Sequence, residues 1–527
     1  MKNFFKLTTT ILIISLIAVS CFNAGAVETS HANRQKQFKN TSVVKFKNSA
    51  DLINLPESYS SKDLGYCTSV KRQTGDMCWN FASISTFETT LLKNNLFSSD
   101  LSTSALDNWA TTRPNGEGWI RTSGSAGTTL IPLGYFTSRN GPVENTDNNV
   151  KVAANAISYY DKGDDSLIKL AIMRTGAVTA NYINDGYAYS KNNNAYCLTD
   201  PIDLNSGHSV SVVGWDDNYS KENFDGNYTP KNDGAWLCKN SWGTNYGTNG
   251  GYLWISYEDY YLFSSDTFDP SFAIETPAVI KESDYLYQNE EFGATYNFSY
   301  IDSKDVTYFN VFDFSENGNV LDKVIFETTS LGAKYNVYYV PVDESSAPIS
   351  DRSKWHFIDK GTVNYNGYIC VDAEDTIIPN SKGAIAVEIN TDVTKYNVEN
   401  NVGVSEWLRE SGTKQMRFQS TCESGKSFVT FGNKIVDVRD FYIEQLDDYI
   451  GGTLVIKALT NGKVDTSLIG DVDYNEKVNI TDASLIQKHL AKLQLLESHQ
   501  LKNADFNGDG VVNILDTTAI QKHIANI

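Results

Sequence analysis

Cysteine and histidine are scarce in this chain, which contains 7 cysteines and 6 histidines among 527 residues. So few cysteines exclude a disulfide scaffold as the main source of stability in a large secreted protein. Basic charge is also in deficit, because 44 Lys and Arg stand against 64 Asp and Glu, a formal net charge of −20. This balance argues against nucleic acid and anionic membranes as partners and favours cation binding.

Long apolar runs are missing after Ala26. No later segment approaches the roughly 20 apolar residues that a membrane-spanning helix needs, so we expect no transmembrane segment. Residues 1–26 carry Lys2 and Lys6, then an apolar run over 11–19, and end with Ala-Gly-Ala at 24–26. These features are typical of a signal peptide cleaved after Ala26, which predicts a secreted, extracellular protein.

The length predicts two to four domains. Helical periodicity comes first, after Cys78 and around 165–174, and strand-like stretches follow at 209–213, 235–238 and 251–256. This order predicts an α+β domain with two lobes. The full division that we expect is a signal peptide at 1–26, a short leader or arm at 27–54, the α+β domain at 55–282, a β-rich domain at 283–459, a linker at 460–468 and a repeat domain at 469–527.

The stretch from Gln73 to Ala82 carries the first chemical signal. Cys78 opens an amphipathic run, and a cysteine in the first turn of a helix lies at the positive end of the helix dipole. That position lowers a thiol pKa and suits a nucleophile. The alternative is a small buried apolar residue, as most free cysteines are, and this stretch alone leaves both open.

A histidine and an asparagine complete a candidate site. His208 is the only histidine between positions 55 and 282, and it stands at the entrance to a predicted strand, far downstream of Cys78. Asn240 follows in the string Asn-Ser-Trp-Gly at 240–243. An Asn can orient an imidazole through the ring nitrogen far from the nucleophile, while Trp242 shields that bond from water.

Residues 55–269 resemble the papain-like cysteine peptidases. The resemblance rests on Leu-Pro-Glu-Ser at 55–58, Gln73 to Ala82, Gly-Ser-Ala-Gly at 124–127, Gly-His-Ser-Val at 207–210 and Asn-Ser-Trp-Gly at 240–243, and the separation of Cys78 and His208 also falls in the family's range. It implies a two-lobed peptidase fold and no catalytic cofactor. The implied roles are nucleophile for Cys78, general base and acid for His208, orienting residue for Asn240, oxyanion donor for Gln73, and substrate contacts for Gly127, Thr128 and Trp242.

The chain departs from the papain-like pattern at two places in the site. Gln73 precedes Cys78 by five positions where the family has six, with Asp76 and Met77 between them. A Gly-Thr pair at 127–128 replaces the family's paired glycine. The first departure leaves open a rival interpretation in which the domain only binds peptide, as an adhesive or protective component. A second rival keeps the fold and makes the chain a transferase or a processing enzyme for scaffold partners.

Residues 283–459 alternate strand-like runs with Asp, Asn, Gly and Ser turns, which predicts a β-sandwich. A sandwich placed behind such a peptidase resembles a lectin-like module of bacterial relatives, which implies carbohydrate as a ligand. Trp355 and Trp407 could stack on sugars, and core packing is an equal alternative for each.

The C-terminal segment contains an internal repeat, since the pattern that begins at Asp471 recurs from Asp505. Each copy offers oxygen ligands at loop positions 1, 3, 5, 9 and 12 and a backbone carbonyl at position 7, the donor set of a calcium loop. The predicted ligands are Asp471, Asp473, Asn475, Lys477, Asn479 and Asp482 in the first copy, and Asp505, Asn507, Asp509, Val511, Asn513 and Asp516 in the second.

The repeat resembles a type I dockerin, which implies a small all-α domain with two structural Ca²⁺ ions. It also implies a cohesin module on a scaffoldin as partner. Glu476 stands where glycine favours the turn, so we expect weaker Ca²⁺ binding in the first loop. Together the patterns predict a secreted cysteine endopeptidase attached to a cohesin-bearing, cellulosome-like scaffold.

Overall fold

The computed structural model describes residues 55–527 apart from short internal gaps, which lie at 98–99, 145–149, 203–206, 301–304, 316, 379–381, 392–399, 407–417, 420–422, 433, 440–451, 464–467, 476 and 497. The predicted signal peptide and leader, Trp407 and Glu476 therefore lie outside the described residues. Within the described part, no helix has the length and apolar character needed to cross a membrane.

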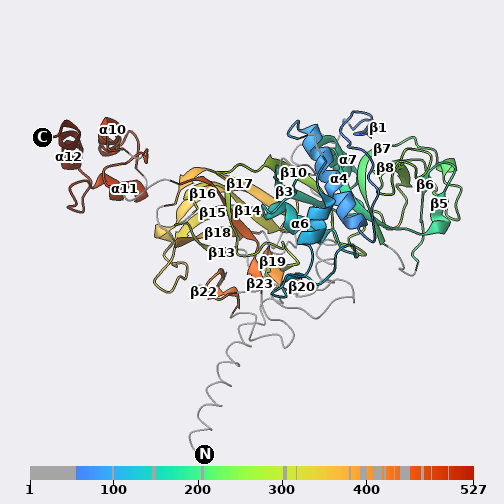
Figure 1. The fold of residues 1–527 in the computed structure, drawn as a ribbon. Coiled ribbons are helices and arrows are strands. Elements are labelled where there is room, and N and C mark those ends of the chain that lie inside the picture. Colours follow the sequence, from blue (N-terminus) through green and yellow to red (C-terminus); the bar gives the residue numbers. More distant parts are fainter. Residues whose placement is uncertain are drawn as a thin grey trace, which may run out of the picture.

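The first lobe is built around helix α4 (Cys78–Lys93), which the apolar periodicity after Cys78 predicts. An unbroken run of α4, from Trp79 to Leu91, is buried, because other elements cover the helix on all sides. Two shorter helices, α5 (Thr103–Trp109) and α6 (Leu130–Thr137), pack beside it. Figure 1 shows these helices together at the blue end of the chain.

The second lobe is a set of mostly antiparallel strands, in which only the described pair β6 and β9 is parallel, with helix α7 (Asp165–Thr175) against them. The predicted strands at 209–213, 235–238 and 251–256 correspond to β7, β8 and β9, so this part of the prediction is confirmed. The strands and short helices of this sheet region are β1 (Ser58–Ser60), β3 (Val152–Tyr160), β4 (Val178–Ile183), η2 (Gly186–Ala188), β5 (Tyr189–Ser190), β6 (Ala195–Tyr196), β7 (Gly207–Asp216), η3 (Lys221–Asn223), β8 (Ala235–Lys239), β9 (Tyr252–Ser256) and β10 (Ser271–Val279). Strand β2 (Gly118–Trp119) lies outside this sheet and pairs with β20 (Phe418–Gln419).

The middle of the chain forms the predicted β-sandwich. One layer has the strand order β16-β15-β18-β13-β21-β22, and the other contains β11, β24, β14 and β17. Apolar side chains of both layers, such as Val387 and Phe326, make one buried core. The strands are β11 (Tyr285–Tyr287), β12 (Tyr296–Tyr300), β13 (Asp305–Asp313), β14 (Val320–Thr328), β15 (Lys334–Pro341), β16 (His356–Thr362), β17 (Gly367–Ile377), β18 (Lys382–Asn390), β19 (Asn400–Glu406), β20 (Phe418–Gln419), β21 (Ser427–Phe431), β22 (Lys434–Asp437), β23 (Gly452–Leu454) and β24 (Ile456–Gly462).

The two halves on either side of the predicted boundary at 282–283 are joined by one sheet and one core. Strand β17 of the sandwich pairs with β3 of the first half, where Gly367 faces Ser158. A Cβ atom on Gly367 would lie 2.1 Å from the carbonyl oxygen of Ile157, so the pairing requires glycine here. Phe292 and Val455 of the sandwich belong to the same buried cluster as Trp79 and Phe136.

The predicted linker at 460–468 begins too early. Strand β24 continues through Gly462 and pairs with Val320 of β14, so residues 460–462 belong to the sandwich. Asn461 and Gly462 are residue types that favour turns, but main-chain pairing with β14 outweighs that local preference. Residues 464–467 lie outside the described residues.

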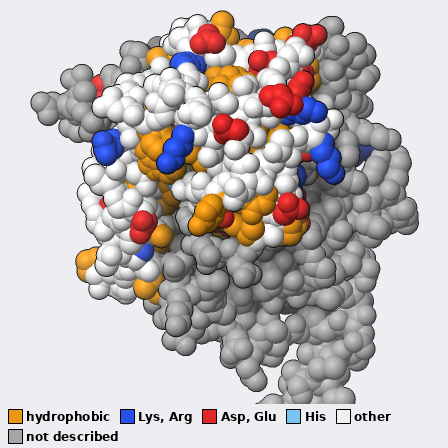
Figure 2. All heavy atoms as spheres, turned by 90° about the vertical axis from the view of Figure 1, so that its right-hand side faces the viewer, with side chains coloured by type: hydrophobic (Ala, Val, Ile, Leu, Met, Phe, Trp, Pro, Cys, Tyr) orange, Lys and Arg blue, Asp and Glu red, His pale blue; other side chains and the backbone are white. Residues whose placement is uncertain are grey.

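The repeat domain consists of α10 (Ile480–Leu490), α11 (Ser498–Ala504) and α12 (Ile514–Ala525), a small all-α group seen at the C-terminus in Figure 1. Both α10 and α12 begin with a capping box, Asn479 with Asp482 and Asn513 with Asp516. Small and aliphatic side chains such as Ile486 and Ile520 form its core. The end of the molecule opposite this domain carries acidic and basic side chains interspersed with apolar patches (Figure 2).

Candidate active site

The thiol of Cys78 stands at the first residue of α4 and faces the start of β7. Burial of this thiol acts to raise its pKa. Hydrogen bonding to His208, the charge of that ring, and hydrogen bonds from Ser209 outweigh burial, so the pKa of Cys78 is lowered. Of the two interpretations of Cys78, this environment favours the reactive thiolate, because inert buried thiols have raised pKa values.

The ring of His208 is held from two sides. Its Nε2 lies 2.9 Å from Oδ1 of Asn240, which leaves Nδ1 as the ring nitrogen for Cys78. Trp242 stacks on the ring at 4.5 Å between centroids, and Tyr182 meets it edge-on. His208 is 5% exposed, so the bond to Asn240 is shielded from water. The structure thus brings together Cys78, His208, Asn240 and Trp242.

Asn240 is fixed by its own neighbours as well. Its Oδ1 also accepts the backbone N–H of Ser241 at 2.7 Å. Its Nδ2 and the hydroxyl of Ser85 are buried without a hydrogen-bond partner among the described residues, and both residues border a cavity of about 10 Å³. That volume is close to the space a single water molecule requires.

The loop that carries Gln73 is hydrogen-bonded to the loop that carries Asn240. Arg72 and Trp242 form an isolated antiparallel bridge, and the N–H of Gln73 donates to the carbonyl of Ser241 at 2.7 Å. The hydroxyl of Ser241 donates to Oε1 of Gln73 at 2.6 Å, and Nε2 of Gln73 donates to the carbonyl of Gly75 at 3.0 Å. Among the described residues, the second N–H of the Gln73 side-chain amide has no hydrogen-bond partner, so it is available to a ligand in spite of the shortened loop.

The segment that the resemblance assigns to substrate lies against the catalytic helix. Gly127 touches the indole of Trp79 so closely that an added Cβ would come within 2.4 Å of it. Glycine at 127 is therefore required by packing, whatever its role towards substrate. The hydroxyl of Thr128 accepts the N–H of Leu130 at 2.9 Å, which turns the chain into α6.

A buried ion pair holds the segment 123–127, part of which the resemblance assigns to substrate, and no pattern in the sequence indicates the pair. Arg121 and Asp107 lie 2.8 Å apart with side chains 4% and 6% exposed. Asp107 accepts from the hydroxyl of Ser123 at 2.5 Å and from the N–H of Gly124 at 2.9 Å. Arg121 donates to the carbonyl of Ser125 at 2.7 Å, and its guanidinium lies 4.8 Å above the ring of Trp79.

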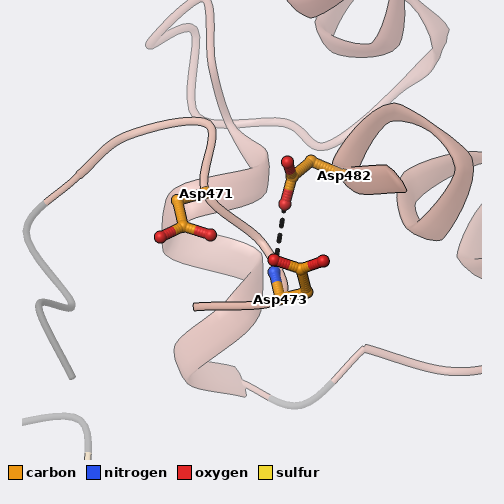
Figure 3. A group of neighbouring side chains, drawn as sticks. All are labelled: Asp471, Asp473 and Asp482. Atoms are coloured by element: carbon orange, nitrogen blue, oxygen red, sulfur yellow. Dashed lines mark hydrogen bonds between the residues drawn. The ribbon is translucent and has the colours of Figure 1, made fainter. Parts of the chain in front are cut away.

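The predicted calcium ligands lie in two loops of similar construction. In the first loop, carboxylate oxygens of Asp471, Asp473 and Asp482 lie within 4.8 Å of one another (Figure 3). Asp482 accepts the N–H of Asp473 at 3.1 Å, and Asn475 donates its N–H to Asp471. Such closely spaced carboxylates fit a hard cation such as Ca²⁺.

The second loop has the same kinds of side chain in a more open arrangement. Asp505 accepts the N–H groups of Asp509 and Gly510, and Asp516 accepts that of Asn507. Among the described acidic residues, those of this loop do not form a cluster as close as that of the first. Asn479 and Asn513 cap their helices, and each donates through its side-chain amide to the carbonyl at position 7, Lys477 or Val511.

In the sandwich, Trp355 packs against its own domain. Its indole N–H donates to the carbonyl of Ile349 at 2.9 Å, its ring meets Phe309 edge-on, and Arg352 lies over its face. Packing within the sandwich, the alternative to stacking on a sugar, therefore accounts for the position of the Trp355 side chain.

Comparison with known proteins gives the same three parts. A model of the papain family cysteine proteases matches residues 55–265, a lectin-like domain matches 286–460, and a type I dockerin domain matches 469–525. The solved structure of the clostridial cysteine protease Cwp84 after propeptide cleavage is 31% identical with a TM-score of 0.68. The match covers 77% of this chain and 99% of that one. The chain belongs to the papain family of cysteine proteases.

A second solved structure contains the cysteine protease and lectin-like domains of Cwp84, described as a surface layer associated protein of Clostridium difficile. It is 29% identical with a TM-score of 0.69, over 83% of this chain and 98% of that one. A probable cysteine proteinase 361L of Invertebrate iridescent virus 6 is 33% identical over 79 residues, 15% of this chain and 14% of the viral protein. The chain thus combines a papain-like peptidase fold, a lectin-like sandwich and a dockerin.

Proposed function

We propose that this papain family member is a secreted cysteine endopeptidase that works through Cys78, His208 and Asn240. The observation that carries the proposal is the thiol of Cys78, whose pKa is lowered by a ring that is itself fixed to Asn240. A thiolate held against an oriented imidazole is the arrangement that cysteine peptidases require.

In the proposed reaction the Cys78 thiolate attacks the carbonyl carbon of a peptide bond. The resulting oxyanion accepts hydrogen bonds from the backbone N–H of Cys78 and from the free N–H of the Gln73 amide. His208 gives its proton to the leaving amine, and a thioester to Cys78 forms as the C–N bond breaks. His208 then takes a proton from water, which attacks the thioester and releases the acid and the thiolate.

Titration with an epoxysuccinyl inhibitor, run beside cleavage of a peptide library, tests this proposal. We expect one inhibitor molecule to bind per chain, at Cys78, and peptide cleavage to be lost in proportion to the labelled fraction. Cys78→Ala should abolish both, while Cys67→Ala, which removes another incompletely buried thiol, should change neither. Peptide binding without labelling or cleavage would instead support the non-catalytic rival, and transfer of the acyl group to an added amine would support the transferase.

We further propose that the dockerin attaches the enzyme to a cohesin module of a scaffoldin outside the cell. The type I dockerin match, the surface layer association of the related protease Cwp84, and the signal-like sequence at 1–26 support this location. Ca²⁺ would be held by the two ligand sets of the repeat, where it would order the loops that start α10 and α12.

Capture on an immobilised type I cohesin tests the attachment. We expect the full chain to bind in Ca²⁺ and to elute in EGTA, and the double variant Asp482→Ala with Asp516→Ala to pass through. Cys78→Ala should bind like the unaltered chain, because it leaves the dockerin intact. Retention of the double variant in EGTA would contradict the proposed calcium-dependent attachment.

A further inference from the structure

A cavity of about 230 Å³ lies where the peptidase half meets the lectin-like sandwich. The peptidase side contributes the end of β3, the start and the end of α7, and β10. The sandwich side contributes the loop before β15 and the loop before β17. The lining residues are Tyr159, Tyr160, Asp164, Leu167, Arg174, Glu275, Leu331, Asn364, Tyr365 and Asn366. Cys78, His208 and Asn240 are not among them.

Asn366 offers this cavity a hydrogen-bond acceptor that the described part of the protein does not use. The residue is 8% exposed, and its Oδ1 is buried without a partner among the described residues. Its backbone carbonyl accepts the N–H of Tyr159 at 2.8 Å, which fixes the residue in the joint between the two halves. A buried acceptor without a donor is destabilising, so a ligand that supplies an O–H would be favoured.

The charges of the lining exclude an anionic ligand. Arg174 binds Glu275 through Nε to Oε2 at 2.7 Å and Nη2 to Oε1 at 2.5 Å, so this pair is internally neutral. Asp164 is then the remaining charged group of the lining. One oxygen of Asp164 accepts the N–H of Asp161 at 3.1 Å, which leaves acceptor capacity on the carboxylate. The polar groups therefore favour a ligand that donates hydrogen bonds and carries no negative charge.

The remaining lining includes the exposed Asn364 but is otherwise dominated by leucine side chains and by the aromatic rings of Tyr159, Tyr160 and Tyr365. The volume is below the roughly 300–1,000 Å³ of pockets that hold drug-sized ligands, so it suits a single ring. Sugars combine an apolar C–H face with several O–H donors. We propose that this junction cavity binds one unit of a neutral saccharide, with its hydroxyls on Asn366 and Asp164 and its apolar face on the tyrosines.

Saturation-transfer NMR on the full chain carrying Cys78→Ala tests the site without self-cleavage. The probes are glucose, galactose, mannose, xylose and N-acetylglucosamine, with glucuronate as the anionic comparison. We expect at least one neutral sugar to bind, and Asn366→Ala and Tyr365→Ala each to weaken it at least ten-fold. Phe357→Ala, which removes an aromatic ring of the sandwich that is 54% exposed and outside the cavity, should leave binding unchanged.

Leu331→Trp supplies a second test, because it fills the cavity without removing a hydrogen-bonding group, and it should also abolish binding. Thermal unfolding of each variant shows whether its fold is intact. No binding by any neutral sugar, tighter binding of glucuronate, or binding that all three cavity variants retain would overturn the proposal. Because the tested protein carries Cys78→Ala, a negative result here leaves the proposed peptidase activity untouched.

Discussion

Ser241 connects the two parts of the candidate site: its hydroxyl donates to Oε1 of Gln73 at 2.6 Å, while its backbone N–H donates to Oδ1 of Asn240 at 2.7 Å. The group that would meet the oxyanion and the group that orients the imidazole are thus fixed by one residue. The shortened loop before Cys78 does not leave Gln73 unsupported, because Ser241 holds the oxygen end of its amide.

Replacing Ser241 by Ala should lower kcat about five-fold with little change in KM. The lost hydrogen bond is worth about 1 kcal/mol, and it positions a donor that matters only when the oxyanion has formed. Gln73→Ala should cost on the order of 100-fold, as for other oxyanion donors. Steady-state kinetics on a peptide substrate measure both. If Ser241→Ala lowers kcat equally in a Gln73→Ala background, Ser241 does not act through Gln73.

Alkylation by iodoacetamide at pH 6 should modify Cys78 and spare Cys197 and Cys238. A lowered pKa keeps Cys78 a thiolate as the pH falls below the usual value near 9. Burial is the main reason that the pKa of Cys197 is raised to about 12 and that of Cys238 well above its usual value, so these thiols stay protonated. Mass spectrometry of each cysteine peptide gives the rates.

His208→Ala is the matching variant for this measurement. It leaves the burial that raises the pKa of Cys78 and removes the His208 ring, the largest of the groups that lower it, so that only the hydrogen bonds of Ser209 still act to lower it. Alkylation of Cys78 at pH 6 should then fall at least ten-fold. An unchanged rate in this variant would show that His208 does not control the thiol.

Asp107→Asn should raise KM and lower the free energy of unfolding by about 3 kcal/mol. The change leaves the buried charge of Arg121 without its partner, and breaking such pairs typically costs about 3–5 kcal/mol. The substrate segment at 123–127 loses its anchor, so peptide binding weakens. Asp322→Asn is the control: its pair with Lys323 has side chains 27% and 24% exposed, so the change should cost less than about 1 kcal/mol. An unchanged KM in Asp107→Asn would show that this ion pair does not support substrate binding.

Calcium titration of the full chain should resolve two sites that differ by about ten-fold in affinity. Gly510 holds a positive φ at loop position 6, a conformation that glycine adopts easily and Glu476 would adopt only with strain. Asp471→Ala should therefore remove the weaker phase and Asp505→Ala the tighter one in calorimetry. Loss of the tighter phase in Asp471→Ala would reverse the assignment.

Cys78, His208 and Asn240 could be proposed as site residues from the sequence because each lies in a short, recognisable sequence string. The predicted helix after Cys78 and the strand after His208 are local periodicities, and the structure has both. The calcium loops could be predicted for the same reason, since all the ligands of a loop fall within one short contiguous segment. Local patterns of this kind can be recognised without knowledge of the fold.

The rest of the site depends on contacts between distant segments. The pairing of Arg72 with Trp242 sets Gln73 beside Ser241, and no property of either string predicts that register. Arg121 and Asp107 resemble ordinary surface charges in the sequence, and only the fold places them in the interior beside the ring of Trp79. The pairing of Gly367 with β3 joins segments that are far apart in the sequence, so periodicity within each domain gives no sign of it.

That last contact has a consequence for how such proteins diversify. A dockerin that makes its own small core can be exchanged between enzymes by moving one gene segment. The sandwich cannot, because β17 completes a sheet begun by β3 and Phe292 fills a core shared with the peptidase half. We therefore expect the protease and its lectin-like partner to be inherited as a single unit, with recombination points falling after Gly462 rather than near residue 282.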